Sequence, residues 1–196
     1  FGAASFLSPL VYSYVVLNLK DPANTSLSIF RSIVPAGLPW ISLYWLFAVI
    51  SVLMIVVIAV SKFPTVELTG EEKAGPIKTH IMLFKRRVVI LFFIGMICYV
   101  GTEQGTANWM SQFLSTYHGY DPQTTGAKAV AYFWGLMTAG GVLGLVLLKI
   151  MDSRKVLIIF TLLALVFLSA AIFGSAKISL IAFPWIGFFA SVMYPI

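Results

Sequence analysis

Charged side chains are scarce in this sequence of 196 residues. Asp, Glu, Lys and Arg together make up 10% of the chain, whereas a soluble globular domain carries roughly a quarter. Hydrophobic residues make up 60%, and the mean hydropathy is +0.96. This balance excludes an ordinary soluble domain and indicates helices that are surrounded by lipid.

Cysteine is almost absent as well. Cys98 is the one cysteine in the chain, so an intrachain disulfide is excluded. It lies in an apolar run, where a free cysteine behaves as a small hydrophobic residue. No pairing of a nucleophile with a base and no cluster of metal ligands is visible in the sequence. We therefore expect no enzyme, no cofactor and no metal site.

What the sequence does contain is a series of apolar runs of about twenty residues, separated by short charged stretches. This pattern predicts an all-α membrane protein with about six transmembrane helices. Phe1 and Ile196 both lie inside apolar runs, so we expect the chain to be part of a longer protein. The predicted spans cover residues 1–19, 40–61, 88–114, 128–149, 156–174 and a last stretch from 177 onward.

The basic residues predict the orientation of these spans. Alternate loops lie on the same side of the membrane, so loops 62–87 and 149–155 share a side. These two loops hold nine Lys and Arg, and the other three hold four. The richer side is expected to be cytoplasmic. The net charge of +6 is therefore interpreted as a topology signal, and no nucleic-acid partner is expected.

Polar side chains gather in residues 99–113, which continue an otherwise apolar run. On a helix, Gln104, Asn108 and Ser111 lie at positions i, i+4 and i+7 and share one face. Polar groups at membrane depth are costly, so this face should line a bundle interior or a water-filled cavity. Bordering this face are Glu103, Trp109 and Gln112.

Three further features suggest structural roles. Gly140, Gly141 and Gly144 contain a GxxxG pattern, which lets another helix approach closely. Pro9 should kink the first span, because proline removes a helical hydrogen bond. A tight charged turn at 149–155 carries Asp152, Arg154 and Lys155.

Several short segments resemble the fucose:proton symporter family of the major facilitator superfamily, which includes glucose/galactose permeases. Cys98–Gly101 followed by Trp109 looks like the family's seventh helix. The whole chain then resembles helices five to ten of twelve. Four other segments agree in order, namely Phe1–Ser5, Ser61–Pro64, Ser153–Leu157 and Ser191–Pro195.

This resemblance implies a domain organisation. Residues 1–61 would be the last two helices of the N-terminal half, 62–87 the cytoplasmic loop between the halves, and 88–196 the first four helices of the C-terminal half. The charges of Asp152, Arg154 and Lys155 would latch the cytoplasmic ends of helices. Many relatives have Gly-Arg where this chain has Gly140–Gly141, so a latch through that arginine is absent.

The resemblance also implies an activity: proton-coupled uptake of a monosaccharide by alternating access, with the site near the midplane between two halves. The protein would be a functional monomer in a bacterial inner membrane. Its partners would be a small sugar and the lipid bilayer, with protons as the coupling ion. The family's proton-carrying carboxylates lie in helices one and four, outside this chain.

A sugar is a polyol with one apolar face, which suits the residues named above. Gln104, Asn108 and Gln112 would bind hydroxyl groups, and Trp109 or Trp134 would cover the ring. Glu103 would be a sugar ligand or a titrating group. Alternatively, the amides join helices, Glu103 is a neutral carboxyl bonded to a neighbouring helix, and the tryptophans serve packing or the membrane interface.

Two other functions remain open at this stage. One is a transporter-like sensor or partner-binding membrane protein that no longer moves a substrate. The other is a drug-type proton antiporter of the same fold, whose cavity should be dominated by Phe and Met rather than by amides.

Overall fold

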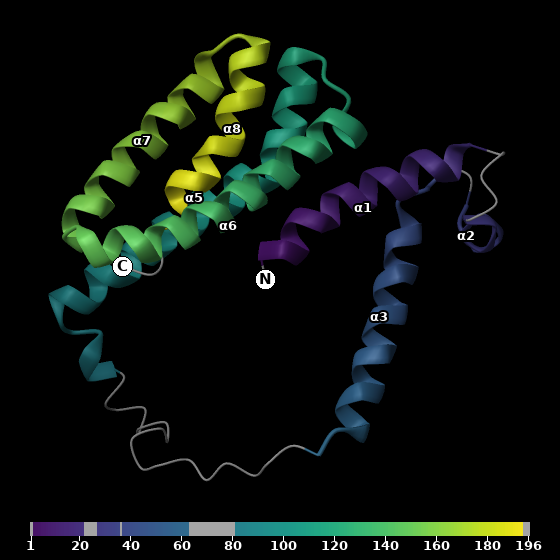
Figure 1. Cartoon of the computed structure of the whole chain (residues 1–196), viewed down its shortest axis with the longest axis horizontal. Coiled ribbons are helices and arrows are strands. Elements are labelled where there is room, and N and C mark those ends of the chain that lie inside the picture. Colours follow the sequence, from purple (N-terminus) through teal and green to yellow (C-terminus); the bar gives the residue numbers. More distant parts are fainter. Residues whose placement is uncertain (1, 22–26, 36, 63–80, 194–196) are drawn as a thin grey trace.

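The computed structural model describes residues 2–21, 27–35, 37–62 and 81–193, and all regular structure in these ranges is helical. The elements, arranged as in Figure 1, are α1 (Gly2–Lys20), α2 (Ser28–Ile33), α3 (Ile41–Val60), α5 (Arg87–His118), the π-helical turn η2 (Pro122–Gly126), α6 (Ala127–Ile150), α7 (Ser153–Phe173) and α8 (Ala176–Ala190).

Five of the described helical stretches are long and apolar enough to cross a membrane. They are α1, α3, α5, α7 and the continuous stretch Pro122–Ile150, which joins η2 to α6. α8 is apolar too, but its 15 residues rise only about 22 Å, against a hydrocarbon core of about 30 Å. The fold class predicted from composition, an all-α membrane protein, is confirmed.

The end of α5 differs from the prediction. The third span was expected to end at residue 114, but α5 continues to His118. Gly119 ends the helix with a positive φ of 70°, a conformation that glycine adopts without strain. Its N–H donates to the carbonyl of Ser115, the bond of an αL C-cap, and the N–H of Tyr120 donates to the carbonyl of Leu114.

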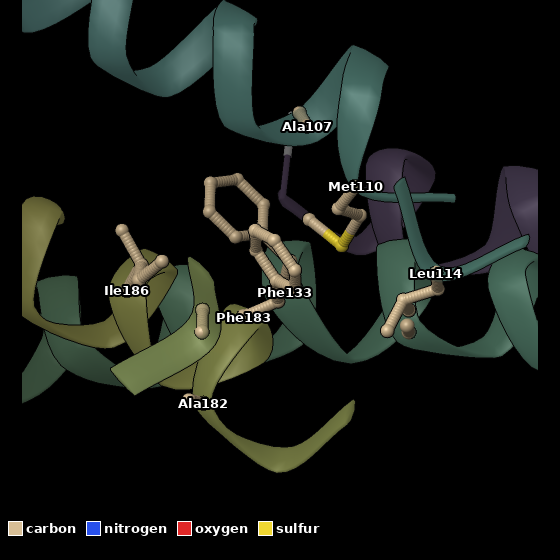
Figure 2. Packing of buried hydrophobic residues seen from close by; sticks show 9 residues of the cluster. Ala107, Met110, Leu114, Phe133, Ala182, Phe183 and Ile186 are labelled. Atoms are coloured by element: carbon tan, nitrogen blue, oxygen red, sulfur yellow. The ribbon is translucent and has the colours of Figure 1, made fainter. Parts of the chain in front are cut away.

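A hydrophobic core joins the C-terminal half of α5 to α6 and α8. Figure 2 shows Met110 of α5 and Phe183 and Ile186 of α8 gathered around Phe133 of α6, which is fully buried. α7 packs along α8, and α1 packs along α6 on the other side. α3 makes its main contact with α1.

The backbones of α6 and α8 approach each other closely at glycines. A methyl group added to Gly140 would overlap the carbonyl oxygen of Phe188, and one added to Gly187 would overlap that of Phe133. Because a backbone carbonyl cannot rotate out of the way, neither position has room for a larger residue. Close backbone approach at small residues is the usual basis of helix packing in membranes.

The segment between α1 and α3, which lies outside the predicted spans, contains the short helix α2. Arg31 of the short helix α2 donates to the carbonyls of Asn18 (3.1 Å), Leu19 (3.3 Å) and Asp21. A cation at the C-terminal carbonyls of a helix is favourable for the helix dipole. Arg31 therefore joins α2 to the end of α1. Most of the predicted inter-half loop, residues 63–80, lies outside the described residues.

Candidate functional site

The polar stretch 99–113 lies where α5 begins to pack against other helices. N-terminal to it, residues 87–98 are almost all exposed. Within it, Thr106 is buried, and Ala107 and Met110 belong to the core formed with α6 and α8. The stretch therefore combines a packed face with an open face on the same turns of helix.

The amides lie on the open face. Gln104, Asn108 and Gln112 are all exposed and follow one another at intervals of four residues, so they form a stripe along α5. Gln112 Nε2 donates to the hydroxyl of Thr116 at 3.1 Å. Asn108 makes no hydrogen bond to any residue that the structure describes. The amide of Asn108 is thus available to a ligand or to a helix outside this chain.

Glu103 and Ser111 border this stripe in different ways. Glu103 is half-buried and precedes Ala107 by four residues, which places it in line with the packed face. Gln104 Nε2 donates to Glu103 Oε1 at 3.1 Å, so the carboxylate is bonded to the amide stripe. Ser111 Oγ donates to the carbonyl of Pro122 at 3.3 Å. Ser111 therefore lies against η2 rather than in the stripe.

The two tryptophans that were expected to cover a sugar ring, Trp109 and Trp134, have different surroundings. Trp109 is 70% exposed on α5. Trp134 is half-buried on α6, where its ring meets Phe133 edge-on at 5.4 Å and borders the hydrophobic core. Trp109 is thus free to cover a ligand, whereas Trp134 already packs against protein. That either tryptophan takes part in a sugar site stays a prediction.

The charged turn before α7 has a clear local structure. Asp152 is the N-cap of α7, and its Oδ1 accepts from the backbone N–H of Arg154 at 2.9 Å and of Lys155 at 3.4 Å. The side chains of Arg154 and Lys155 are exposed and form no ion pair with the described residues. A latch to another helix therefore stays a prediction, while the capping role of Asp152 is visible.

The remaining predicted structural residues lie as follows. Gly140 faces α8, and Gly144 faces Val192 in the turn after α8, where a methyl group on Gly144 would lie 3.1 Å from Val192 Cγ2. Gly141 faces open space, with no atom within 4 Å of such a methyl group. Pro9 lies inside α1, which is helical on both sides of it.

Sequence reasoning missed two hollows. One, of about 480 Å³, lies between α6 and α8, with Lys128, Tyr132 and Trp185 among its lining residues. The other, of about 420 Å³, lies between α1 and α6 near Phe6 and Thr138. Neither is lined by the α5 amides. In the sequence, the available sign of the hollow between α6 and α8 is that Lys128, Tyr132 and Leu136 recur every four residues. Residues at the membrane interface commonly show the same pattern.

No group of three or more His, Cys, Asp or Glu side chains able to hold a metal occurs in the described ranges. The long apolar helices define an α-helical, multi-pass membrane protein. Its polar groups on α5 are suited to hydrogen bonding rather than to covalent chemistry.

Comparison with known proteins gives relatives named as established or putative glucose/galactose transporters, of which three are described here. A putative glucose/galactose transporter of Helicobacter pylori (strain ATCC 700392 / 26695) is 29% identical over 148 residues, 76% of this chain and 35% of the relative. Its counterpart in strain J99 is 26% identical over 192 residues, 96% of this chain and 45% of the relative. A glucose/galactose transporter of Brucella abortus biovar 1 (strain 9-941) is 29% identical over 154 residues, 78% of this chain and 37% of the relative.

The chain spans less than half the length of these relatives. No protein-family model matches it, and no solved structure matches it significantly. The comparisons thus indicate similarity to bacterial sugar transporters at modest identity.

Proposed function

We propose that this chain is part of a proton-coupled monosaccharide transporter that works by alternating access. The proposed substrates are sugars of the glucose, galactose or fucose type. The relatives named glucose/galactose transporter support the substrate class. The observation that carries the proposal within the chain is the stripe of exposed amides on α5, with Asn108 at its centre.

The position of the stripe along α5 supports a site near the membrane midplane. α5 has 32 residues and is therefore about 48 Å long. On the same rise per residue, Gln104 lies about 26 Å and Asn108 about 32 Å from its start at Arg87, so the stripe begins near the middle of the helix and continues into its second half. Transporters of this kind bind their substrate near the midplane, between two halves.

The chemistry of the stripe suits a sugar. An amide offers both donors and an acceptor, so Gln104 and Asn108 can each bind neighbouring hydroxyl groups. The exposed ring of Trp109 offers an apolar plate on the same helix. Glu103, bonded from Gln104, would accept a further hydroxyl. We assign Glu103 a ligand role, because the resemblance places the proton carriers in helices outside this chain.

Counterflow of labelled sugar tests the proposal. The full-length protein that contains this chain is reconstituted in proteoliposomes, and exchange of glucose, galactose and fucose is measured. Asn108→Ala should weaken the affinity about tenfold, since losing one ligand-paired polar group costs about 1–3 kcal/mol.

Thr102→Ala is the matched control, because the Thr102 hydroxyl bonds within its own helix to the carbonyl of Cys98 at 2.8 Å. This variant should keep the wild-type affinity. Absence of counterflow with all three sugars would contradict the transport function and favour a sensor. Unchanged affinity in Asn108→Ala would remove the amide stripe from the site. Uptake that ignores a proton gradient would contradict the coupling.

A further inference from the structure

The hollow between α6 and α8 has apolar walls, and Lys128 lies at its mouth. Leu136 of α6 and Leu180 and Pro184 of α8 line its inner part. Lys128 and Thr125 lie at the end where η2 meets α6. Lys128 precedes Leu136 by eight residues, so the hollow extends about 12 Å along the helix from the lysine.

A space of about 480 Å³ with apolar walls is too large to stay empty inside a bilayer, because protein and lipid interiors are closely packed. Water would find almost no hydrogen-bonding partner along Leu136, Leu180 and Pro184. A sugar would leave its hydroxyl groups unpaired against the same walls. A hydrocarbon chain fits these walls without either cost.

The mouth of the hollow adds a requirement for negative charge. Lys128 is exposed, and its ammonium group has no hydrogen bond or ion pair within the described part of the chain. Tyr132, one turn further along α6, and Trp185 of α8 also line the hollow and are 57% and 37% exposed. Lys128 and Tyr132 lie in the first two turns of α6, and lysine with an aromatic residue near a helix end is typical of the level of lipid headgroups. Basic pockets between membrane helices bind anionic headgroups.

We propose that this hollow binds an anionic phospholipid, with one acyl chain along Leu136 and Leu180 and the phosphate at Lys128. The lipid belongs to the leaflet opposite the turn at 149–155, because Lys128 and Lys149 lie at opposite ends of α6. The site is separate from the amide stripe on α5 and does not depend on the substrate proposed above.

Native mass spectrometry of the full-length protein tests this site. The protein is taken from nanodiscs that contain phosphatidylglycerol and phosphatidylcholine, and the retained lipids are counted. Lys128→Gln should reduce the retained phosphatidylglycerol about fivefold, which corresponds to about 1 kcal/mol for one basic residue at an anionic surface. Lys128→Arg should retain it, because the charge is kept.

Lys149→Gln is the matched control, since Lys149 is exposed on the same helix but lies at its other end. It should keep the wild-type retention. Leu180→Trp fills the hollow and should remove one bound lipid whatever its headgroup. Equal retention in Lys128→Gln and Lys149→Gln would overturn the proposal. So would a crosslink from Ile181→Cys to another helix of the same protein, which would show that protein covers the hollow.

Discussion

Replacement of Gly140 by alanine tests how closely α6 and α8 must pack. The added methyl group would overlap the carbonyl oxygen of Phe188 and the hydroxyl of Ser191. The hydroxyl can rotate away, but the carbonyl belongs to the backbone of α8, so the helix itself has to move. Overpacking of this kind costs about 1–3 kcal/mol.

Gly141 and Gly144 supply controls on the same helix. Gly141→Ala meets no atom within 4 Å and should be neutral or stabilising by up to about 1 kcal/mol, because alanine favours helix over glycine. Gly144→Ala would lie 3.1 Å from the side chain of Val192, which can shift by a few tenths of an ångström. Gly141→Ala should therefore be the most stable of the three variants, followed by Gly144→Ala and then by Gly140→Ala.

The assay is thermal unfolding of the full-length protein in detergent, followed by intrinsic fluorescence. The free energy of unfolding of Gly140→Ala should lie about 1–3 kcal/mol below that of Gly141→Ala, on the overpacking scale used above. The melting temperature should fall in the same order. Equal melting temperatures for these two variants would refute the close contact between α6 and α8.

Three other predictions can be checked with single variants. Asp152→Ala removes the N-cap of α7 and should cost about 1 kcal/mol in thermal unfolding, whereas Asp152→Asn should cost less because it keeps an acceptor. Met151→Cys and Gln123→Cys, each in a Cys98→Ser background, should react with an impermeant thiol reagent from opposite sides, with Gln123→Cys labelled from outside. Labelling of Met151→Cys from outside would reverse the predicted orientation. Glu103→Gln should leave sugar uptake with altered affinity and an unchanged pH profile, and loss of accumulation with intact exchange would instead make Glu103 a proton carrier.

The membrane spans could be predicted from the sequence because apolar run length alone determines them. α3 begins at Ile41 and ends at Val60, within one residue of the predicted span at each end. The predicted end of the third span, residue 114, was wrong because the polarity of Tyr117 and His118 suggested a turn. The helix ends at Gly119, because this residue adopts the left-handed backbone conformation that commonly ends helices.

The packing faces could not be predicted in the same way. In a soluble protein the buried face of a helix is its apolar face, but lipid is as apolar as a helix interface. The sequence of α7 therefore gave no sign that Phe160 and Ala164 face its neighbours while Leu162 and Leu165 are exposed. For the same reason the hollow beside Tyr132 was not foreseen, although its lining residues recur at regular helical spacing.

The packed face of α5 and its exposed amides lie on different sides of the helix. Burial of Met110 and Leu114 fixes one face of the helix against α6 and α8. The amides of Gln104 and Asn108 are exposed and lie outside that contact. Because polar groups at membrane depth are costly, we expect the Asn108 amide, which makes no hydrogen bond to the described residues, to bind a group outside this chain. Glu103 stands at the boundary, in register with the packed face and bonded from the amide stripe. On the proposed function, variants of Asn108 should therefore change sugar affinity without disturbing the packed face of α5.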